Sequence, residues 1–181
     1  MTAQSILRML QEEIHSVVFA TLDEHGLPQT CVIDLMLWDE GGLYFLTARG
    51  KSFYDRLTAR PFAALTGMKG TDTFSPAAVS LRGAVRSIGT RRLEEIFAKN
   101  PYMARIYPTE QSRQALEVFQ LYRGEGEYFD LSQQPPSARA SPSAGRPSMR
   151  RDTASAGTSA LAARGAAACA PRGASARRPP G

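Results

Sequence analysis

The stretch from Leu43 to Leu57, LYFLTARGKSFYDRL, constrains the fold of this chain more than any other. It predicts a β-strand that ends at Thr47, a turn at Gly50 and a helix that opens at Lys51 and Ser52. Such a junction gathers a hydroxyl, a fixed cation and free backbone N–H groups at the N-terminus of one helix. Because this arrangement favours anions, most often phosphate, the sequence predicts a phosphate site between a strand and a helix.

Short strands joined by glycine-containing turns surround this junction. Apolar and alternating runs predict strands over residues 17–22, 27–38, 43–47, 61–67, 77–88, 115–122 and 127–131. Helical spacing of apolar residues predicts helices over 5–15, 90–99 and 109–114, the second with Thr90 as its N-cap. Many short strands with few helices favour a mainly β fold of the α+β class, built around a barrel.

The chain divides into two regions of different character. Residues 1–133 carry the hydrophobic periodicity, and all eight Phe, all six Tyr and the one Trp lie in them. Residues 134–181 are nearly all Ala, Ser, Pro, Arg and Gly. Because such a segment cannot bury enough apolar area to offset its chain entropy, we expect a folded domain over 1–133 and a disordered tail over 134–181.

The composition of the tail has a second explanation, which is a shift of reading frame in a GC-rich gene. Shifted back by one base, alanine codons become codons for Cys, Arg, Gly or Ser. Five residues would then take the C-x2-C-x2-C-x3-C-P spacing of bacterial iron–sulfur proteins: Ala160, Ala163, Ala166, Ala170 and Pro171. The chain as it stands has only Cys169 there, so no cluster can form on it. A plain disordered extension and an unstable out-of-frame product are the alternatives.

The net charge of +5 is unevenly distributed. Residues 134–181 hold eight Arg and one acid, Asp152, for a charge of +7, which leaves −2 for residues 1–133. The positive charge therefore lies outside the patterned region, which argues against a nucleic-acid-binding surface. No run of about 18 apolar residues predicts a membrane span, and the start lacks the basic-then-apolar order of a secretion signal. With only two cysteines, Cys31 and Cys169, we expect a cytoplasmic protein without a disulfide framework.

The order of the predicted elements resembles the pyridoxamine 5'-phosphate oxidase-like family of FMN-binding split β-barrels. Four segments within residues 14–131 carry the resemblance, in order and at the family's spacing: ATLDEHGLPQ, LYFLTARGKSFYDRL, ARPFAAL and VSLRGAVR. The resemblance implies a split β-barrel with FMN as its cofactor. It also implies a homodimer, because in this family two subunits usually form the flavin site together.

The resemblance assigns one group of residues to the flavin ring. Thr30, Cys31, Val32 and Ile33 lie on the strand that would line the isoalloxazine. This strand would act largely through main-chain groups, with β-branched side chains against the ring. Packing in a barrel core would also explain Val32 and Ile33, so both interpretations stay open.

A second group, Thr47, Lys51 and Ser52, matches the family's phosphate region. Lys51 would supply a compact cation, and Ser52 a hydroxyl and a helix-start N–H. Taken singly, Ser52 is equally explained as a simple N-cap and Lys51 as a solvated surface charge. In the oxidase itself a basic pair would fall on Ser52 and Phe53, and this departure predicts weaker phosphate binding unless Arg49 compensates.

The function implied is a flavoprotein in redox chemistry, with the flavin carrying the electrons. The alternative is a split-barrel module that binds FMN, haem or a deazaflavin without turnover. No segment after Leu131 matches the oxidase's substrate-handling Arg and His, so oxidation of vitamin B6 is not expected. The redox partner and the substrate stay unassigned.

Three further groups of residues could have a functional role. His15, at the end of the first predicted helix, and His25, in a hairpin turn, are expected to be surface residues. They show no metal-ligand spacing with the cysteines, so no metal site is predicted. Trp38 is expected to pack at a hairpin edge, with a flavin cover or a dimer seam as the alternative. A basic cluster fits either a solvated face or a contact to a substrate anion: Arg82, Arg86, Arg91 and Arg92.

Overall fold

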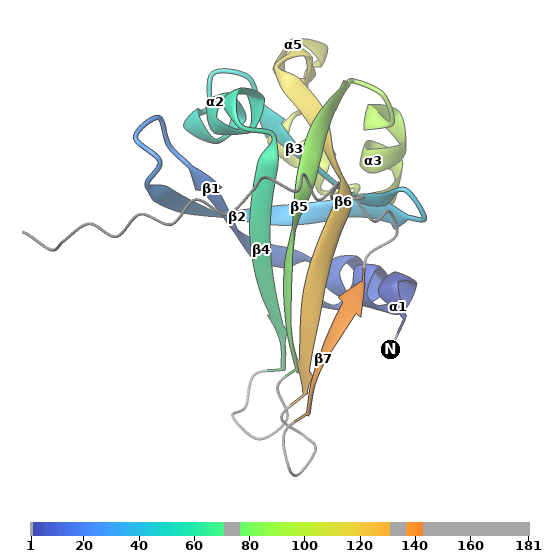
Figure 1. The fold of residues 1–181 in the computed structure, drawn as a ribbon. Helices are drawn as coiled ribbons and strands as arrows, with labels where there is room; N and C mark the ends of the chain where they lie inside the picture. The colour runs from blue at the N-terminus through green and yellow to red at the C-terminus, as the bar shows by residue number, and fades with distance from the viewer. Residues whose placement is uncertain (1, 71–76, 131–136, 143–181) are drawn as a thin grey trace, which may run out of the picture. The chain divides into compact units, whose positions relative to one another are not determined.

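Seven antiparallel strands form one sheet in the computed structural model, which describes residues 2–70, 77–130 and 137–142. The strands are β1 (Ser16–Leu22), β2 (Pro28–Asp39), β3 (Gly42–Ala48), β4 (Phe62–Lys69), β5 (Ala77–Gly89), β6 (Leu116–Asp130) and β7 (Ser137–Pro142). Their order is β3-β2-β1-β4-β5-β6-β7, and β3 also pairs with β6, so the first six close into a barrel (Figure 1). The expected mainly β split barrel is confirmed.

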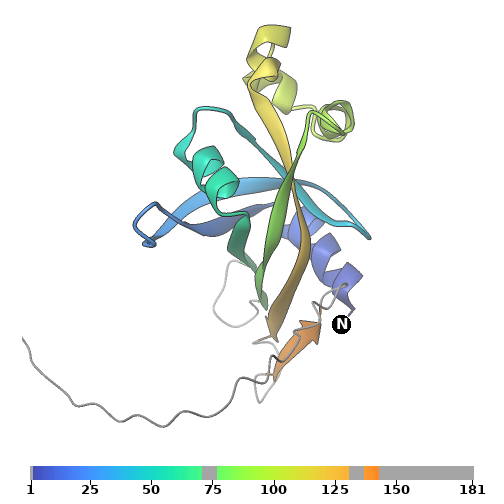
Figure 2. The ribbon, with the colours of Figure 1, turned by 45° about the horizontal axis from the view of Figure 1, so that its top comes forward.

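Strand β6 is one strand of 15 residues, not the two separate strands predicted over 115–122 and 127–131 (Figure 2). Its first half pairs with β3 and its second half with β7, while β5 pairs with residues 118–130. Gly83 of β5 lies opposite Gly124 of β6, and a Cβ on either residue would overlap a carbonyl oxygen of the other strand. The glycines therefore permit a close approach of two strands, whereas the sequence suggested a break.

Strand β7 lies within the segment for which disorder was expected. Residues 137–142 pair with residues 125–130 of β6, so over these six residues the structure differs from the expectation, because main-chain pairing needs no apolar side chains. Residues 143–181, with the alanines of the alternative reading frame, lie outside the described residues. The disordered tail stays a prediction for them.

Six short helical segments accompany the sheet in the described residues: α1 (Ala3–Arg8), the π-helix η1 (Met9–Ile14), α2 (Ser52–Ala59), α3 (Leu93–Lys99), α4 (Met103–Ile106) and α5 (Glu110–Gln114). The predicted helix over 5–15 is thus an α-helix that continues as a π-helix. Thr90 does not cap α3; Arg92 takes the N-cap position with a φ of 68° and no side-chain cap. Thr109 does cap α5, in a reciprocal pair with Ser112.

Two hydrophobic clusters stabilise these elements. The larger fills the barrel, where the rings of Phe19, Phe45, Phe53 and Phe119 contact one another in a chain with centroids 4.6 to 6.1 Å apart. The smaller lies under α3 and α4 and includes Ile96, which is fully buried. None of the described helices has the length and apolar character needed to cross a membrane.

Trp38, near the end of β2, packs against the larger cluster. Its Nε1 donates a hydrogen bond of 2.9 Å to Glu12 of η1. The structure therefore shows packing for this residue and ties η1 to β2 through it.

Candidate cofactor site

The turn between β3 and α2 has the strand-turn-helix form that the sequence predicts. Thr47 is buried at the end of β3, Gly50 has a φ of 82°, and Lys51 is extended at the N-cap of α2. Ser52 is the first helical residue, so the simple N-cap interpretation of Ser52 is wrong by one position. Lys51 makes no capping hydrogen bond, and no side chain within the described ranges accepts from the first N–H groups of α2. Together these groups can hold an anion.

The two cations of this turn differ in their surroundings. Arg49 donates to Glu117 of β6 at 2.9 Å, and the same carboxylate accepts hydrogen bonds from Tyr54 at 3.1 Å and from Ser87. Burial alone would raise the pKa of Glu117, but these hydrogen bonds outweigh it and hold that pKa below its usual value. Lys51 is exposed and pairs with no carboxylate among the described residues. Lys51, not Arg49, is therefore the available cation.

Strand β2 has a free edge along its first half. β1 pairs with residues 28–34 on one side, whereas β3 pairs on the other side only with residues 35–39. The backbone N–H and C=O groups on that other side meet no strand within the described part of the chain. A strand edge of this kind offers donors and acceptors to a ligand.

The side chains of the predicted flavin wall divide between two faces of β2. Val32 is 66% exposed and points outward with Thr30. Cys31 and Ile33 are partly buried and pack against the barrel core. Burial raises the pKa of the Cys31 thiol, which keeps it protonated. Only Thr30 and Val32 can offer side chains to a ligand on the outer face, whereas Cys31 and Ile33 can offer main-chain groups.

The pairing of β2 with β3 places the predicted flavin wall close to the predicted phosphate turn. Leu35 of β2 lies opposite Phe45 of β3, so Ile33 and Thr47 stand two residues beyond this pair, where the strands have separated. Thr47 pairs instead with Glu117 of β6. The two groups of predicted residues, far apart in the sequence, therefore flank the same separation between β2 and β3.

An open hollow of about 810 Å³ lies on the outer face beside this wall, within the size range of small-molecule sites. Its lining comes from β1, β2, β4, β5 and β6: Val18, Ala20, Thr30, Ala64, Leu65, Thr66, Ser80, Leu81, Arg82, Glu125, Gly126 and Glu127. Thr30 is the one predicted site residue in this lining. Sequence reasoning missed the contribution of β4, although its outward alternation of Phe62, Ala64 and Thr66 was visible in the sequence.

Four large apolar side chains are exposed on the outer face of β1, β2 and β4. Val18, Val32, Phe62 and Met68 are 40%, 66%, 54% and 63% exposed. Val18 lies directly opposite Val32 in the β1–β2 register. Exposed apolar side chains on one face are a feature of many surfaces that bind proteins or ligands.

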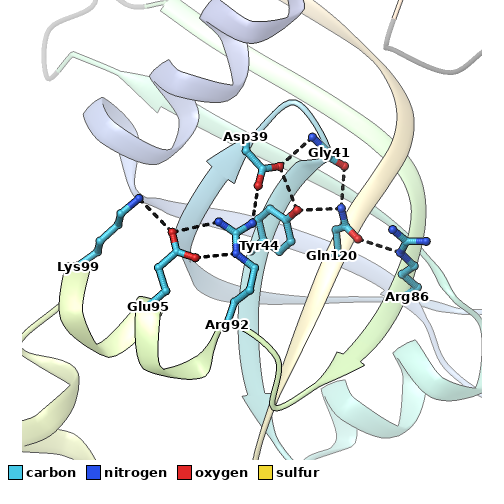
Figure 3. A network of polar contacts seen from close by, with 8 residues as sticks. All are labelled: Asp39, Gly41, Tyr44, Arg86, Arg92, Glu95, Lys99 and Gln120. Atoms are coloured by element: carbon cyan, nitrogen blue, oxygen red, sulfur yellow. Dashed lines mark hydrogen bonds and ion pairs between the residues drawn. The ribbon is translucent and has the colours of Figure 1, made fainter.

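The basic cluster is engaged in contacts within the fold, and Figure 3 shows those of Arg86 and Arg92. Arg92 pairs with Asp39 and Glu95 and stacks 4.2 Å over the ring of Tyr44. Arg86 donates to Gln120 at 2.8 Å, and outside this network Arg82 donates to Glu125 at 2.8 Å. The Nε of Arg91 donates to the carbonyl oxygen of Ile88. These cations join elements of the fold, so a role in binding a substrate anion finds no support here.

The histidines show no arrangement for a metal. Among the described residues no group of three or more His, Cys, Asp or Glu side chains could hold a metal ion. His25 lies in the hairpin turn and is strongly exposed, as expected. His15 is only about a third exposed and makes contacts with Tyr102 and Asp34, so the expectation of a plain surface residue is wrong for it.

Known proteins share this fold. A NimC/NimA family protein from Clostridium acetobutylicum superposes with a TM-score of 0.60 at 17% identity, covering 77% of this chain and 94% of that one. A heme binding protein from Mycobacterium smegmatis gives a TM-score of 0.59 at 16% identity, covering 77% of this chain and 58% of that one. A pyridoxamine 5'-phosphate oxidase-related, FMN binding protein from Nostoc punctiforme gives 0.51 at 11%, covering 76% and 90%. At these identities the likeness concerns the fold.

Sequence comparison adds the family. No curated protein matches the chain. A family model described as pyridoxamine 5'-phosphate oxidase matches residues 5–128, which include all six barrel strands up to Tyr128. The match covers well over half of the chain and confirms the resemblance seen in the sequence. The chain belongs to the pyridoxamine 5'-phosphate oxidase family of split β-barrels.

Proposed function

We propose that this chain is an FMN-binding flavoprotein that works in redox chemistry. The observation that carries the proposal is the β3–α2 turn. There, Lys51 is a cation without a counter-charge among the described residues, and the N-terminus of α2 has no side-chain cap. A phosphate group satisfies both at once. The free edge of β2 lies beside this turn, at the right place for the rest of a flavin nucleotide.

The chain's own residues bind and orient the cofactor. The phosphate is held by Lys51, Ser52 and the first N–H groups of α2. Thr47 lies beside it, at the end of β3. The free edge of β2, at Thr30 to Ile33, offers hydrogen-bonding groups to the polar rim of the ring, and Val32 offers an apolar surface. When bound, FMN supplies electron transfer, which no side chain of the protein provides.

A second copy of the chain completes the site in this proposal. The apolar outer face of β1, β2 and β4 carries Val32, a residue of the flavin wall, so the same face serves the cofactor and a partner subunit. A cytoplasmic location belongs to the same proposal, because the half-buried Cys31 is a free thiol and free thiols persist in reducing compartments.

The proposal is tested by titrating the purified protein with FMN and with riboflavin. A charge-assisted contact contributes roughly 1.5–3 kcal/mol, so Lys51→Ala should weaken FMN binding about tenfold or more. Riboflavin has no phosphate, so its affinity should change little. Flavin fluorescence quenching measures both affinities in one buffer.

The matched control is Lys99→Ala, which removes a lysine from the C-terminal end of α3, where Lys99 pairs with Glu95. This variant should bind FMN as the parent protein does. Equal losses for FMN and riboflavin in Lys51→Ala would place the phosphate elsewhere and contradict the assignment.

The second candidate is a binding module that holds FMN, haem or a deazaflavin without turnover. Because a heme binding protein shares this fold, haem is a candidate ligand alongside the flavins. Haem needs an axial ligand such as histidine, and the described residues offer only His15 and His25. The absorption spectrum decides: a flavin spectrum bleached by reduced nicotinamide supports the redox proposal. A Soret band, or a flavin that only dithionite reduces, supports the module.

A further inference from the structure

Four side chains from three elements and one loop meet at the end of the outer face of β1 and β2. Tyr102, at the N-cap of α4, donates a hydrogen bond of 3.1 Å to Asp34 of β2. Ser16 of β1 donates to the other oxygen of the same carboxylate at 2.6 Å. His15 places its Nε2 3.0 Å from the Tyr102 hydroxyl and 3.7 Å from Asp34. The charges and hydroxyls of this cluster are used in none of the steps proposed above.

The hydrogen bonds of the Tyr102 hydroxyl indicate which ring nitrogen of His15 carries a proton. A hydroxyl that donates to a carboxylate can only accept from a second partner. With Tyr102 donating to Asp34, the Nε2 of His15 is assigned as the donor to the Tyr102 hydroxyl, which leaves Nδ1 as the ring nitrogen open to a ligand. Burial, together with the charge of Asp34, raises the pKa of Tyr102 to about 12, so its hydroxyl keeps its proton at neutral pH.

The backbone holds His15 in a strained conformation. Its φ of 63° and ψ of −62° are those of a classic γ-turn, which is rare for any residue other than glycine. Two backbone hydrogen bonds of 2.8 Å fix it there, from His15 to Leu10 and from Leu35 to His15. It follows a complete π-helical turn, another rare element that recurs at functional sites. Strain of this kind persists only where the surroundings impose it.

The cluster continues the row of side chains expected to face the flavin. Ser16 lies opposite Asp34, Val18 opposite Val32, and Ala20 opposite Thr30 in the β1–β2 register. Successive outward residues of a strand are about 6.8 Å apart. The polar cluster is therefore one step beyond Val32 on the same face. His15 and Asp34 are 32% and 34% exposed, so a ligand on this face can reach them.

We propose that His15 is an acid–base group for the chemistry on this face, with Tyr102 and Asp34 as the positioning residues that hold its Nε2 proton. The inference rests on the proposed flavin function. When bound and reduced by an external two-electron reductant such as dithionite, FMN would supply a ring nitrogen that takes up a proton. Protonated His15 would donate that proton from Nδ1, while its Nε2–H stays hydrogen-bonded to the Tyr102 hydroxyl.

The charges around His15 suit this role. Asp34 is the one carboxylate within ion-pair distance of His15 in the described ranges, and it compensates the charge of the protonated ring. The acids of the preceding π-helix are engaged elsewhere: Glu12 accepts from Trp38, and Glu13 pairs with Lys69 of β4. Ser16 is the polar neighbour from β1 and carries no charge.

The first arm of the test needs no cofactor. The chain has two histidines, so 15N NMR resolves His15 against the exposed His25 as an internal reference. We expect a protected Nε2–H signal for His15 that disappears in Tyr102→Phe, and no such signal for His25. An unprotected His15 ring, or protection that survives in Tyr102→Phe, overturns the proposed geometry.

The second arm measures the midpoint potential of bound FMN against pH. In the parent protein the slope should change at the pH where NMR shows His15 to titrate, and this change should be absent in His15→Gly. Glycine tolerates the positive φ, so this variant removes the imidazole without adding strain. His25→Gly is the matched control and should behave as the parent.

The outcomes of the second arm separate the two claims. A protein that binds FMN and keeps the slope change in His15→Gly overturns the inference and leaves the flavin function standing. A protein that binds no FMN overturns the proposed function, and the inference falls with it.

Discussion

The surroundings of a basic residue decide whether its charge is available to a ligand, as two cations of the β3–α2 turn show. Arg49 and Lys51 are two positions apart and both exposed, yet Arg49 shares its charge with Glu117 and Lys51 does not. The sequence predicts two basic side chains at this helix start. It cannot predict that a carboxylate 68 positions along the chain neutralises one of them. The proposal that Lys51 binds the phosphate therefore depends on the fold.

A second residue, Glu95, makes the stability of the protein depend on pH. The hydrogen bond from Arg92 lowers the pKa of Glu95 to about 2, against a usual value of 4.5. A carboxyl with a depressed folded pKa stabilises the fold above about pH 4.5, and this contribution disappears as the pH falls through about 2. The side chain is 38% exposed, so solvent screens the effect and roughly 0.5 kcal/mol is expected.

Glu95→Gln should therefore lower the free energy of unfolding by about this amount at pH 7, and by less as the pH is taken down toward 3. Urea denaturation at several pH values measures the difference. Glu94→Gln, on the same helix, is the control and should leave the pH profile unchanged. A loss in Glu95→Gln that stays constant from pH 7 to 3 would show that the carboxylate charge is not its cause.

At the scale of elements, one long strand serves two partners. β6 closes the barrel with β3 through its first half and pairs with β7 through its second half. The sequence predicts both halves as strands, because each has apolar residues in alternation. The glycines between them, at 124 and 126, led to the prediction of a break. Local patterns cannot distinguish a glycine that ends a strand from one that lets a neighbouring strand approach.

Gly83→Ala tests that explanation. Its Cβ would overlap the carbonyl oxygen of Arg123, which cannot move without breaking the β5–β6 ladder. We expect a loss of about 2 kcal/mol or more in the free energy of unfolding, the upper part of the range for overpacking. Urea denaturation measures it.

Gly26→Ala provides the comparison. Gly26 has a φ of 80° and open space around it, so alanine there suffers only backbone strain of about 1 kcal/mol. If Gly83→Ala were no less stable than Gly26→Ala, close approach of the strands would not be the reason for glycine at position 83.

At the scale of the whole molecule, the exposed apolar side chains on the outer face of β1, β2 and β4 are the main feature that the structure of one copy does not explain. These side chains, of Val18, Val32, Phe62 and Met68, come from three strands and lie on one side of the sheet. Their alternation within each strand was visible in the sequence. Only the strand order β2-β1-β4, which the sequence does not determine, makes them one surface.

Phe62→Glu should therefore disrupt the proposed homodimer. A buried charge without a partner is costly at an interface, so we expect the parent chain of 19.7 kDa to run as a dimer and the variant mainly as a monomer. Light scattering after size exclusion measures the mass, and FMN titration of the same samples shows whether the site needs both copies. Ile106→Glu, at an exposed apolar residue on α4, is the control. A parent protein that is monomeric when loaded with FMN would contradict the dimer.

The hydrogen bond between Trp38 and Glu12 has a practical consequence. The chain has one tryptophan, and its indole N–H is held by the π-helix that precedes His15. Intrinsic fluorescence excited at the indole band therefore reports a single local event, the docking of the N-terminal segment on β2, and not an average over the protein. A shift of the emission maximum on cofactor loading would be a direct optical signal from β2, the strand that carries the proposed flavin wall.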